Sequence, residues 1–130
     1  MADRILALIG VRGHAAGEIF VLEPGRSYCI GRSRSCDISF RRLPAWIDKT
    51  EEEQNVDMHF RTISGKHLTL AVSADAREVT VTDHSSNGTF LDSRRMECPI
   101  TLTDLDDREH YLRFGSQEEM VLKCRSDDEA

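Results

Sequence analysis

Three short polar segments of the sequence carry side chains that together could bind an anion. They are residues 30–33, 63–67 and 83–90, and each stands beside a short apolar run. Arginine, serine and asparagine supply hydrogen-bond donors, and the planar guanidinium of Arg32 can grip a phosphate through two parallel hydrogen bonds. Glycines in these segments allow bends or close approach of the backbone. We therefore expect anion recognition if the fold brings the segments together.

The composition is that of one soluble globular domain. The chain has 130 residues, of which 39% are hydrophobic and 31% charged, so it can bury a core of its own. The net charge of −6 argues against general nucleic-acid binding, which requires a basic surface. A local basic patch suits a phosphorylated or otherwise anionic peptide, and the alternative is a mixed, solvated surface. The basic residues concerned are Arg32, Arg34, Arg41, Arg42, Arg61 and Lys66.

The cysteines and the N-terminal residues bear on where the protein works. Cys29 and Cys124 stand inside apolar runs and are predicted to be buried thiols, which favours a reducing compartment. The sequence has no Cys-x-x-Cys pair and no paired histidine spacing that would indicate a metal site. The apolar run 5–11 is too short to span a membrane, and no signal-peptide cleavage site follows it. We expect a cytoplasmic protein with no metal, cofactor or membrane partner.

Short apolar runs separated by turn residues predict an all-β fold. Apolar and polar residues alternate most clearly over 67–72 and 78–82. Short and regularly punctuated strands of this kind are typical of a sandwich or a barrel. The other predicted strands are 5–11, 18–22, 28–30, 37–40, 89–91, 100–102, 111–114 and 120–124.

A long irregular stretch, residues 41–60, interrupts the strand pattern. It exceeds the usual length of a connection between strands, so it is either functional or mobile. Thr50 and Glu53 have the spacing of a capping box, which predicts a short helix. Trp46 and Ile47 are expected to fold back over the sandwich, and the alternative is a rim contact with a partner.

The motifs of the polar segments resemble those of the forkhead-associated (FHA) domain. They are Gly31-Arg32, the serine and histidine of Ser64-x-x-His67, and the run Ser86-Asn87-Gly88-Thr89. The resemblance covers about residues 28–91 and implies a two-sheet twisted β-sandwich (FHA/SMAD-like) with recognition loops at one end. It gives one domain over 1–125 with the inserted loop 41–60, followed by an acidic tail at 126–130.

The resemblance also implies a ligand and a role for each motif residue. FHA domains read phosphorylated motifs through arginine, and the family prefers phosphothreonine. Arg32 would grip the phosphate, Ser64 would donate its hydroxyl to it, Ser86 would lie near the phosphothreonine, and Asn87 would hold the peptide backbone. Residues in structural support of the site would be Gly31, His67, Gly88 and Thr89.

Gly65 departs from the family pattern, because a larger polar residue commonly stands at this position and assists binding through its side chain. Only the backbone N–H of Gly65 is left to act there. Lys66 would add positive charge to the site, and the alternative is a lysine that points into solvent.

The expected function is non-catalytic binding of a phosphothreonine-containing protein or peptide, downstream of a serine/threonine kinase. One alternative is a structural or self-associating β-sandwich whose phosphate site is vestigial, because a fold does not guarantee its usual function. A catalytic role for Ser64 and His67, with Asp83, is the other alternative. It is disfavoured because the sequence has no nucleophile elbow and no phosphate-binding P-loop.

Overall fold

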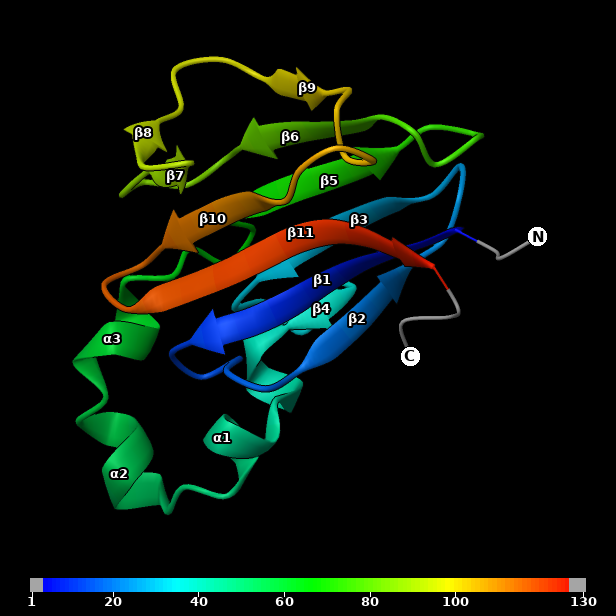
Figure 1. The fold of residues 1–130 in the computed structure, drawn as a ribbon. Helices are drawn as coiled ribbons and strands as arrows, with labels where there is room; N and C mark the ends of the chain where they lie inside the picture. The colour runs from blue at the N-terminus through cyan, green and yellow to red at the C-terminus, as the bar shows by residue number, and fades with distance from the viewer. Residues whose placement is uncertain (1–3, 127–130) are drawn as a thin grey trace.

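The computed structural model describes residues 4–126 and consists of two packed β-sheets, which confirms the predicted all-β sandwich (Figure 1). The first sheet has six strands in the order β2-β1-β11-β10-β7-β8, and each hydrogen-bonded pair in it is antiparallel. Its strands are β1 (Arg4–Arg12), β2 (Ile19–Leu22), β7 (Thr89–Leu91), β8 (Arg94–Arg95), β10 (His110–Phe114) and β11 (Glu118–Ser126).

The second sheet has five strands in the order β4-β3-β5-β6-β9, with β3 and β4 parallel and the other pairs antiparallel. Its strands are β3 (Ser27–Gly31), β4 (Ile38–Ser39), β5 (Leu68–Val72), β6 (Val79–Asp83) and β9 (Ile100–Leu102). Each predicted strand corresponds to an observed one, while β8 was not predicted because its two exposed arginines carry no apolar signal.

Alternation along the strands places the core between the two sheets. Leu68 and Leu70 of β5 are fully buried, as are Leu112 of β10 and Leu122 of β11. Complete burial of one such side chain stabilises the fold by roughly 1.5–3 kcal/mol. This core holds the strand ends in fixed positions, and the loops that carry the polar motifs begin and end there.

Two predicted boundaries differ from the observed ones. The strand predicted at 37–40 is only Ile38–Ser39, because Phe40 begins a 3-10 helix, η1 (Phe40–Arg42), and turns its ring into the core against Phe114. The acidic tail was predicted to begin at 126, but Ser126 belongs to β11. Residues 127–130 lie outside the described residues.

The inserted stretch is not irregular but forms three short helices, α1 (Pro44–Ile47), α2 (Glu51–Asn55) and α3 (Met58–Arg61). The predicted capping box is present, since Thr50 and Glu53 exchange hydrogen bonds at the start of α2. Trp46 is buried as expected, but the prediction for Ile47 is wrong, because its side chain is 59% exposed. None of the helices in the described part of the chain is long and apolar enough to cross a membrane.

The cysteines are less buried than their apolar surroundings predicted. Cys29 and Cys124 are only half-buried, whereas Cys36 is buried. The prediction overlooked that side chains on alternate positions of a strand face opposite sides, so that Cys29 lies on the outer face while its neighbour Ile30 is in the core.

Candidate functional site

The first two polar segments meet at the end of the sandwich where β3 finishes and β5 begins (Figure 1). The backbone N–H of Arg32 donates to the carbonyl of Ser64 at 3.0 Å, and that of Ser33 donates to Gly65 at 2.9 Å. The N–H of His67 donates to Ile30 at 2.9 Å. These bonds hold the loop of Arg32 against the loop of Ser64, although about thirty residues separate them in the sequence.

Gly31 allows this contact because it has no side chain. A Cβ atom at this position would lie 2.3 Å from the carbonyl oxygen of Gly65 and 2.9 Å from the backbone nitrogen of His67. Any larger residue would push the two loops apart. Close approach of the backbone, rather than a left-handed turn, is therefore what requires glycine here.

The third segment joins the loop of Ser64 through hydrogen bonds that involve side chains. The backbone N–H of Ser86 donates to the hydroxyl oxygen of Ser64 at 3.1 Å, and the side-chain amide of Asn87 donates to the carbonyl of Thr62 at 3.1 Å. Because the Ser64 oxygen accepts this bond, its own O–H is left to donate to a ligand. Ser86 and Asn87 are exposed, so their polar groups are accessible from solvent.

The ring of His67 is fully buried and links the loop of Ser64 to the loop of Gly88. Its Nδ1 atom accepts from the backbone N–H of Ser64 at 3.0 Å, and its Nε2 atom lies 3.0 Å from the carbonyl of Gly88. A ring that accepts at Nδ1 carries its proton at Nε2, so Nε2–H donates to Gly88. Burial lowers the pKa of His67, although the Gly88 bond and the charge of Asp83 act to raise it. His67 contacts the backbone of Ser64 and not its hydroxyl.

The loop of Ser86 is held in shape from within by Asp83. Its carboxylate accepts from the hydroxyl of Ser85 at 2.6 Å and from the hydroxyl of Thr89 at 2.8 Å, while Ser85 in turn accepts from the N–H of Gly88 at 2.7 Å. Burial opposes the charge on Asp83, but these hydrogen bonds outweigh it and lower the pKa. Gly88 has φ = +98°, the left-handed conformation that glycine adopts most easily.

Two arginines lie over one aromatic ring of the insert. The guanidinium carbons of Arg32 and Arg41 are 5.9 Å and 5.3 Å from the centroid of Phe60. Trp46 stacks on the same ring with 3.5 Å between centroids and 10° between planes. Arg32, Arg41 and Trp46 therefore all contact the ring of Phe60. Neither guanidinium has a hydrogen-bond acceptor or an acidic partner among residues 4–126.

The remaining basic residues of the predicted patch have different environments. The guanidinium of Arg42 donates to the carbonyls of Arg34 and Cys36 at 2.7 Å, and to that of Asp37 at 2.9 Å, so it clamps the loop that follows Arg32. Arg61 donates to a carbonyl within the insert. Lys66 is exposed and has no ion pair among the described residues.

Buried polar contacts fix the insert to the sandwich beside this site. His59 of α3 contacts the carboxylate of Glu118, which is fully buried and also accepts from the backbone N–H groups of His14 and Ala15 at 2.8 Å and 3.0 Å. A buried carboxylate is stable only with such partners. The contacts fix α3, and through α3 they fix the position of Phe60.

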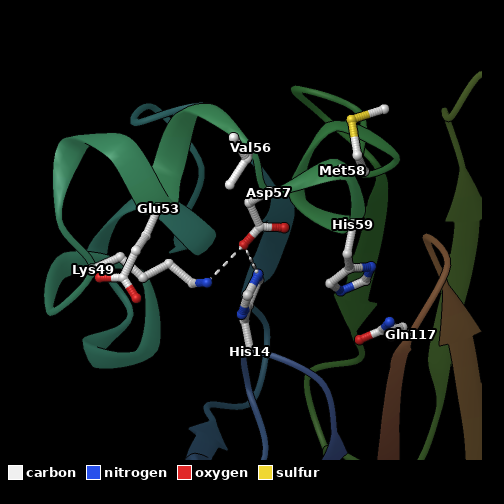
Figure 2. A pocket seen from close by; sticks show the side chains of 8 residues that line it. All are labelled: His14, Lys49, Glu53, Val56, Asp57, Met58, His59 and Gln117. Atoms are coloured by element: carbon white, nitrogen blue, oxygen red, sulfur yellow. Dashed lines mark ion pairs between the residues drawn. The ribbon is translucent and has the colours of Figure 1, made fainter.

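A second group of ionic contacts ties the start of α3 to the rest of the molecule. Figure 2 shows Asp57 between Lys49 and His14, with nitrogen–oxygen distances of 3.2 Å and 2.9 Å. Asp57 also accepts from the N–H of Phe60 at 2.9 Å. Burial opposes its charge, but the bonds from Phe60 and Lys49 outweigh that effect and lower the pKa. His14, Lys49 and Asp57 line a cavity of about 490 Å³, and none of the predicted site residues lines it.

The structure thus brings the three predicted segments together at one end of the sandwich. Sequence reasoning missed Arg42 as a clamp of the loop, and it gave Phe60 no role at the site. It noted Arg41 only as one of several basic residues. The spacing of the motifs holds no signal for these three residues, because their positions depend on how the insert packs.

The fold and the motifs define a two-sheet β-sandwich with polar motif loops at one end, and comparison with known proteins gives its family. The FHA domain model matches residues 28–108, and the chain belongs to that family. The FHA domain of CT664 from Chlamydia trachomatis has a TM-score of 0.66 at 21% identity, covering 92% of this chain and 96% of that one. The N-terminal FHA domain of S. cerevisiae Rad53p, in complex with a phosphothreonine peptide, has a TM-score of 0.57 at 17% identity, with coverage of 96% and 95%.

Among curated proteins, the E3 ubiquitin-protein ligase CHFR of Pongo abelii is 30% identical over 97 residues. The match covers 72% of this chain but only 14% of the relative. The chain therefore spans a small part of the length of this relative, and the similarity concerns that part alone.

Proposed function

We propose that this chain is a non-catalytic module that binds a phosphothreonine-containing segment of another protein in the cytoplasm, downstream of a serine/threonine kinase. Membership of the FHA family supports the class of ligand, because the similar Rad53p domain is solved with a phosphothreonine peptide. The free cysteines of the described chain are compatible with the reducing cytoplasm.

The observation that carries the proposal is that the guanidiniums of Arg32 and Arg41 contact the same aromatic ring and have no acidic partner among residues 4–126. Two positive charges without acidic partners at one ring create a local positive potential, which favours an anion near them. A phosphothreonine carries close to two negative charges and three acceptor oxygens, which suits two cationic donors.

The other motif residues complete the proposed contacts. Arg32 grips the phosphate, and the O–H of Ser64 and the N–H of Gly65 add donors, while Asn87 holds the peptide backbone. Hydrogen bonds to charged groups contribute roughly 1.5–3 kcal/mol each, so a few of them anchor a short peptide.

Calorimetric titration with a degenerate phosphothreonine peptide pool tests the proposal. We expect binding to the phosphothreonine pool, weaker binding to the phosphoserine pool and none to the unphosphorylated pool. Replacing the bidentate donor by Arg32→Ala should lower the affinity roughly a hundredfold. Arg77→Ala is the matched control, because Arg77 is exposed, pairs with Asp106 and comes from the turn between β5 and β6.

Binding that is equal for phosphorylated and unphosphorylated pools would reject the phosphate site. Binding that needs phosphate but survives Arg32→Ala would reject the assigned residue. If the folded wild-type protein binds none of the pools, the proposed function is rejected in favour of a structural or self-associating β-sandwich with a vestigial phosphate site.

One observation favours that alternative, which is self-association through the β2 edge of the six-stranded sheet. Ile19 of the edge strand β2 is 58% exposed, and it is the first of a row of directly opposed neighbours, Ile9, Val121 and Tyr111. An exposed apolar edge strand can pair with a second copy. Light scattering across a concentration series separates a monomer from such a dimer, and Ile19→Lys should abolish the dimer.

A further inference from the structure

Two cysteines of the Arg32 loop are in direct contact. The sulfur of Cys29, on β3, lies 3.0 Å from the sulfur of Cys36, which follows the loop. Both are free thiols. A disulfide bond is about 2.05 Å long, so a shift of about 1 Å would join the two sulfurs without unfolding the sheet.

The two thiols differ in their access to solvent. Cys29 lines an open cavity of about 460 Å³ together with Lys66 and His84, so a small oxidant can reach it. Cys36 is buried, and its S–H points to the carbonyl oxygen of Gly65 at 3.2 Å. Burial and the side-chain hydrogen bond between Cys36 and Cys29 raise the pKa of Cys36 to about 12, so Cys36 keeps its proton.

We propose that Cys29 and Cys36 form a modification site, a dithiol that a peroxide oxidises to an intramolecular disulfide within the ligand-binding loops. The sulfur of Cys29 attacks one oxygen of hydrogen peroxide. The O–O bond breaks, Cys29 becomes a sulfenic acid, and the other oxygen leaves as water with the thiol proton. The sulfur of Cys36 then attacks the sulfur of Cys29. The S–O bond breaks, and a second water leaves with the Cys36 proton.

Electrons balance in this sequence, because two thiols lose two electrons and two hydrogens while one peroxide becomes two waters. The accessible Cys29 is the thiol attacked first, and the buried Cys36 resolves the sulfenic acid. Intracellular disulfides in ordinary proteins are usually transient, catalytic or redox-sensing. A reversible bridge of this kind is therefore compatible with the proposed location.

The bridge would alter the two loops that meet at the site. Gly65 accepts from the N–H of Ser33 and from the thiol of Cys36. Oxidation removes the second donor and draws Cys36 toward β3. The loop between the two cysteines carries Arg32. This consequence rests on the proposed function, and we expect phosphopeptide affinity to fall roughly two- to tenfold on oxidation, as for the loss of one hydrogen bond.

Mass spectrometry of the intact folded chain tests the modification without any peptide. After treatment with hydrogen peroxide, we expect the protein to lose the mass of two hydrogens and, on alkylation under denaturing conditions, to take up two alkyl groups fewer than the untreated protein. Peptide mapping should then give a Cys29–Cys36 bridge that dithiothreitol reverses. Cys29→Ser and Cys36→Ser should each prevent the bridge. Cys98→Ser is the matched control, because Cys98 is exposed and distant in sequence, and it should leave the bridge intact.

Oxidation that only adds oxygen to single thiols, or that bridges molecules through Cys98, would overturn the proposal. Loss of two hydrogens on oxidation of either Cys29→Ser or Cys36→Ser would overturn the pairing. Calorimetry of the bridged and reduced proteins with the phosphothreonine pool then tests the coupling, which equal affinities would reject. If the reduced protein binds no pool, the proposed function fails, while the mass measurement still decides the modification.

Discussion

The Nε2–H of His67 donates to the backbone carbonyl of Gly88 at 3.0 Å, across 21 positions of the sequence. The ring lies between two loops and also accepts from the backbone of Ser64 at 3.0 Å. Both bonds require the neutral ring with its proton on Nε2. His67 is therefore a structural link between the loops, and its protonation state matters for stability.

The first prediction concerns pH. Burial lowers the pKa of His67 from its ordinary value of 6.5, so below that value the unfolded chain binds a proton that the folded chain does not. The contribution of His67 to stability is thus complete above pH 6.5 and is lost as the pH falls below it. We expect urea titrations to give a lower free energy of unfolding at about pH 5 than at about pH 7.

The matched variant for this prediction is His67→Gln, which keeps an N–H donor for Gly88 and does not titrate. It should be less stable than the wild type at neutral pH but should lose less stability on acidification. Equal losses in the two proteins would assign the pH dependence to other groups.

The second prediction compares Gly31 with Gly65. Gly31→Ala places a Cβ atom 2.3 Å from the carbonyl oxygen of Gly65, so we expect a loss of about 1–3 kcal/mol in the free energy of unfolding and weaker phosphopeptide binding. Gly65→Ala is the control, because a Cβ atom at Gly65 would have the Cβ atom of Ser33 as its nearest neighbour, at 4.0 Å, and would therefore clash with nothing. Thermal denaturation measures the stability of both variants. A Gly31→Ala protein as stable as Gly65→Ala would contradict the close contact at Gly31.

The third prediction separates two adjacent arginines. Arg41→Ala removes a cation without an acidic partner in the described chain, so phosphopeptide affinity should fall about tenfold while the unfolding temperature stays nearly constant. Arg42→Ala removes three hydrogen bonds to the loop carbonyls, so the unfolding temperature should fall as well. Calorimetry and thermal melts on the same preparations give both quantities. An Arg41→Ala protein with wild-type affinity would exclude Arg41 from the site.

The fourth prediction concerns the ring beneath these arginines. Phe60→Leu keeps an apolar side chain but loses the stacking on Trp46 and the cation–π contacts with Arg32 and Arg41. Such contacts are worth about 0.5–1 kcal/mol each at accessible sites, so we expect affinity to fall severalfold in calorimetric titration. Val56→Ala is the control within the insert, because Val56 is 74% exposed. An unchanged affinity in Phe60→Leu would show that the Phe60 ring does not contribute to phosphopeptide binding.

Local patterns were sufficient to predict much of the fold. Alternation over 67–72 and 78–82 predicted β5 and β6, and the spacing of Thr50 and Glu53 predicted the capping box of α2. These features depend on neighbours in the sequence, which is why they could be read without a structure. The motif residues of the site were likewise recognisable, since their identity and order carry the family resemblance.

The sequence by itself determined the sandwich, the family and the three loops of the site. Only the tertiary structure placed Arg32 and Arg41 at the ring of Phe60, and only it brought the Cys29 and Cys36 thiols together. Such contacts depend on how the insert and the loops pack against the two sheets. No periodicity or spacing encodes that packing, because it is decided by burial and hydrogen bonding between segments far apart in the chain.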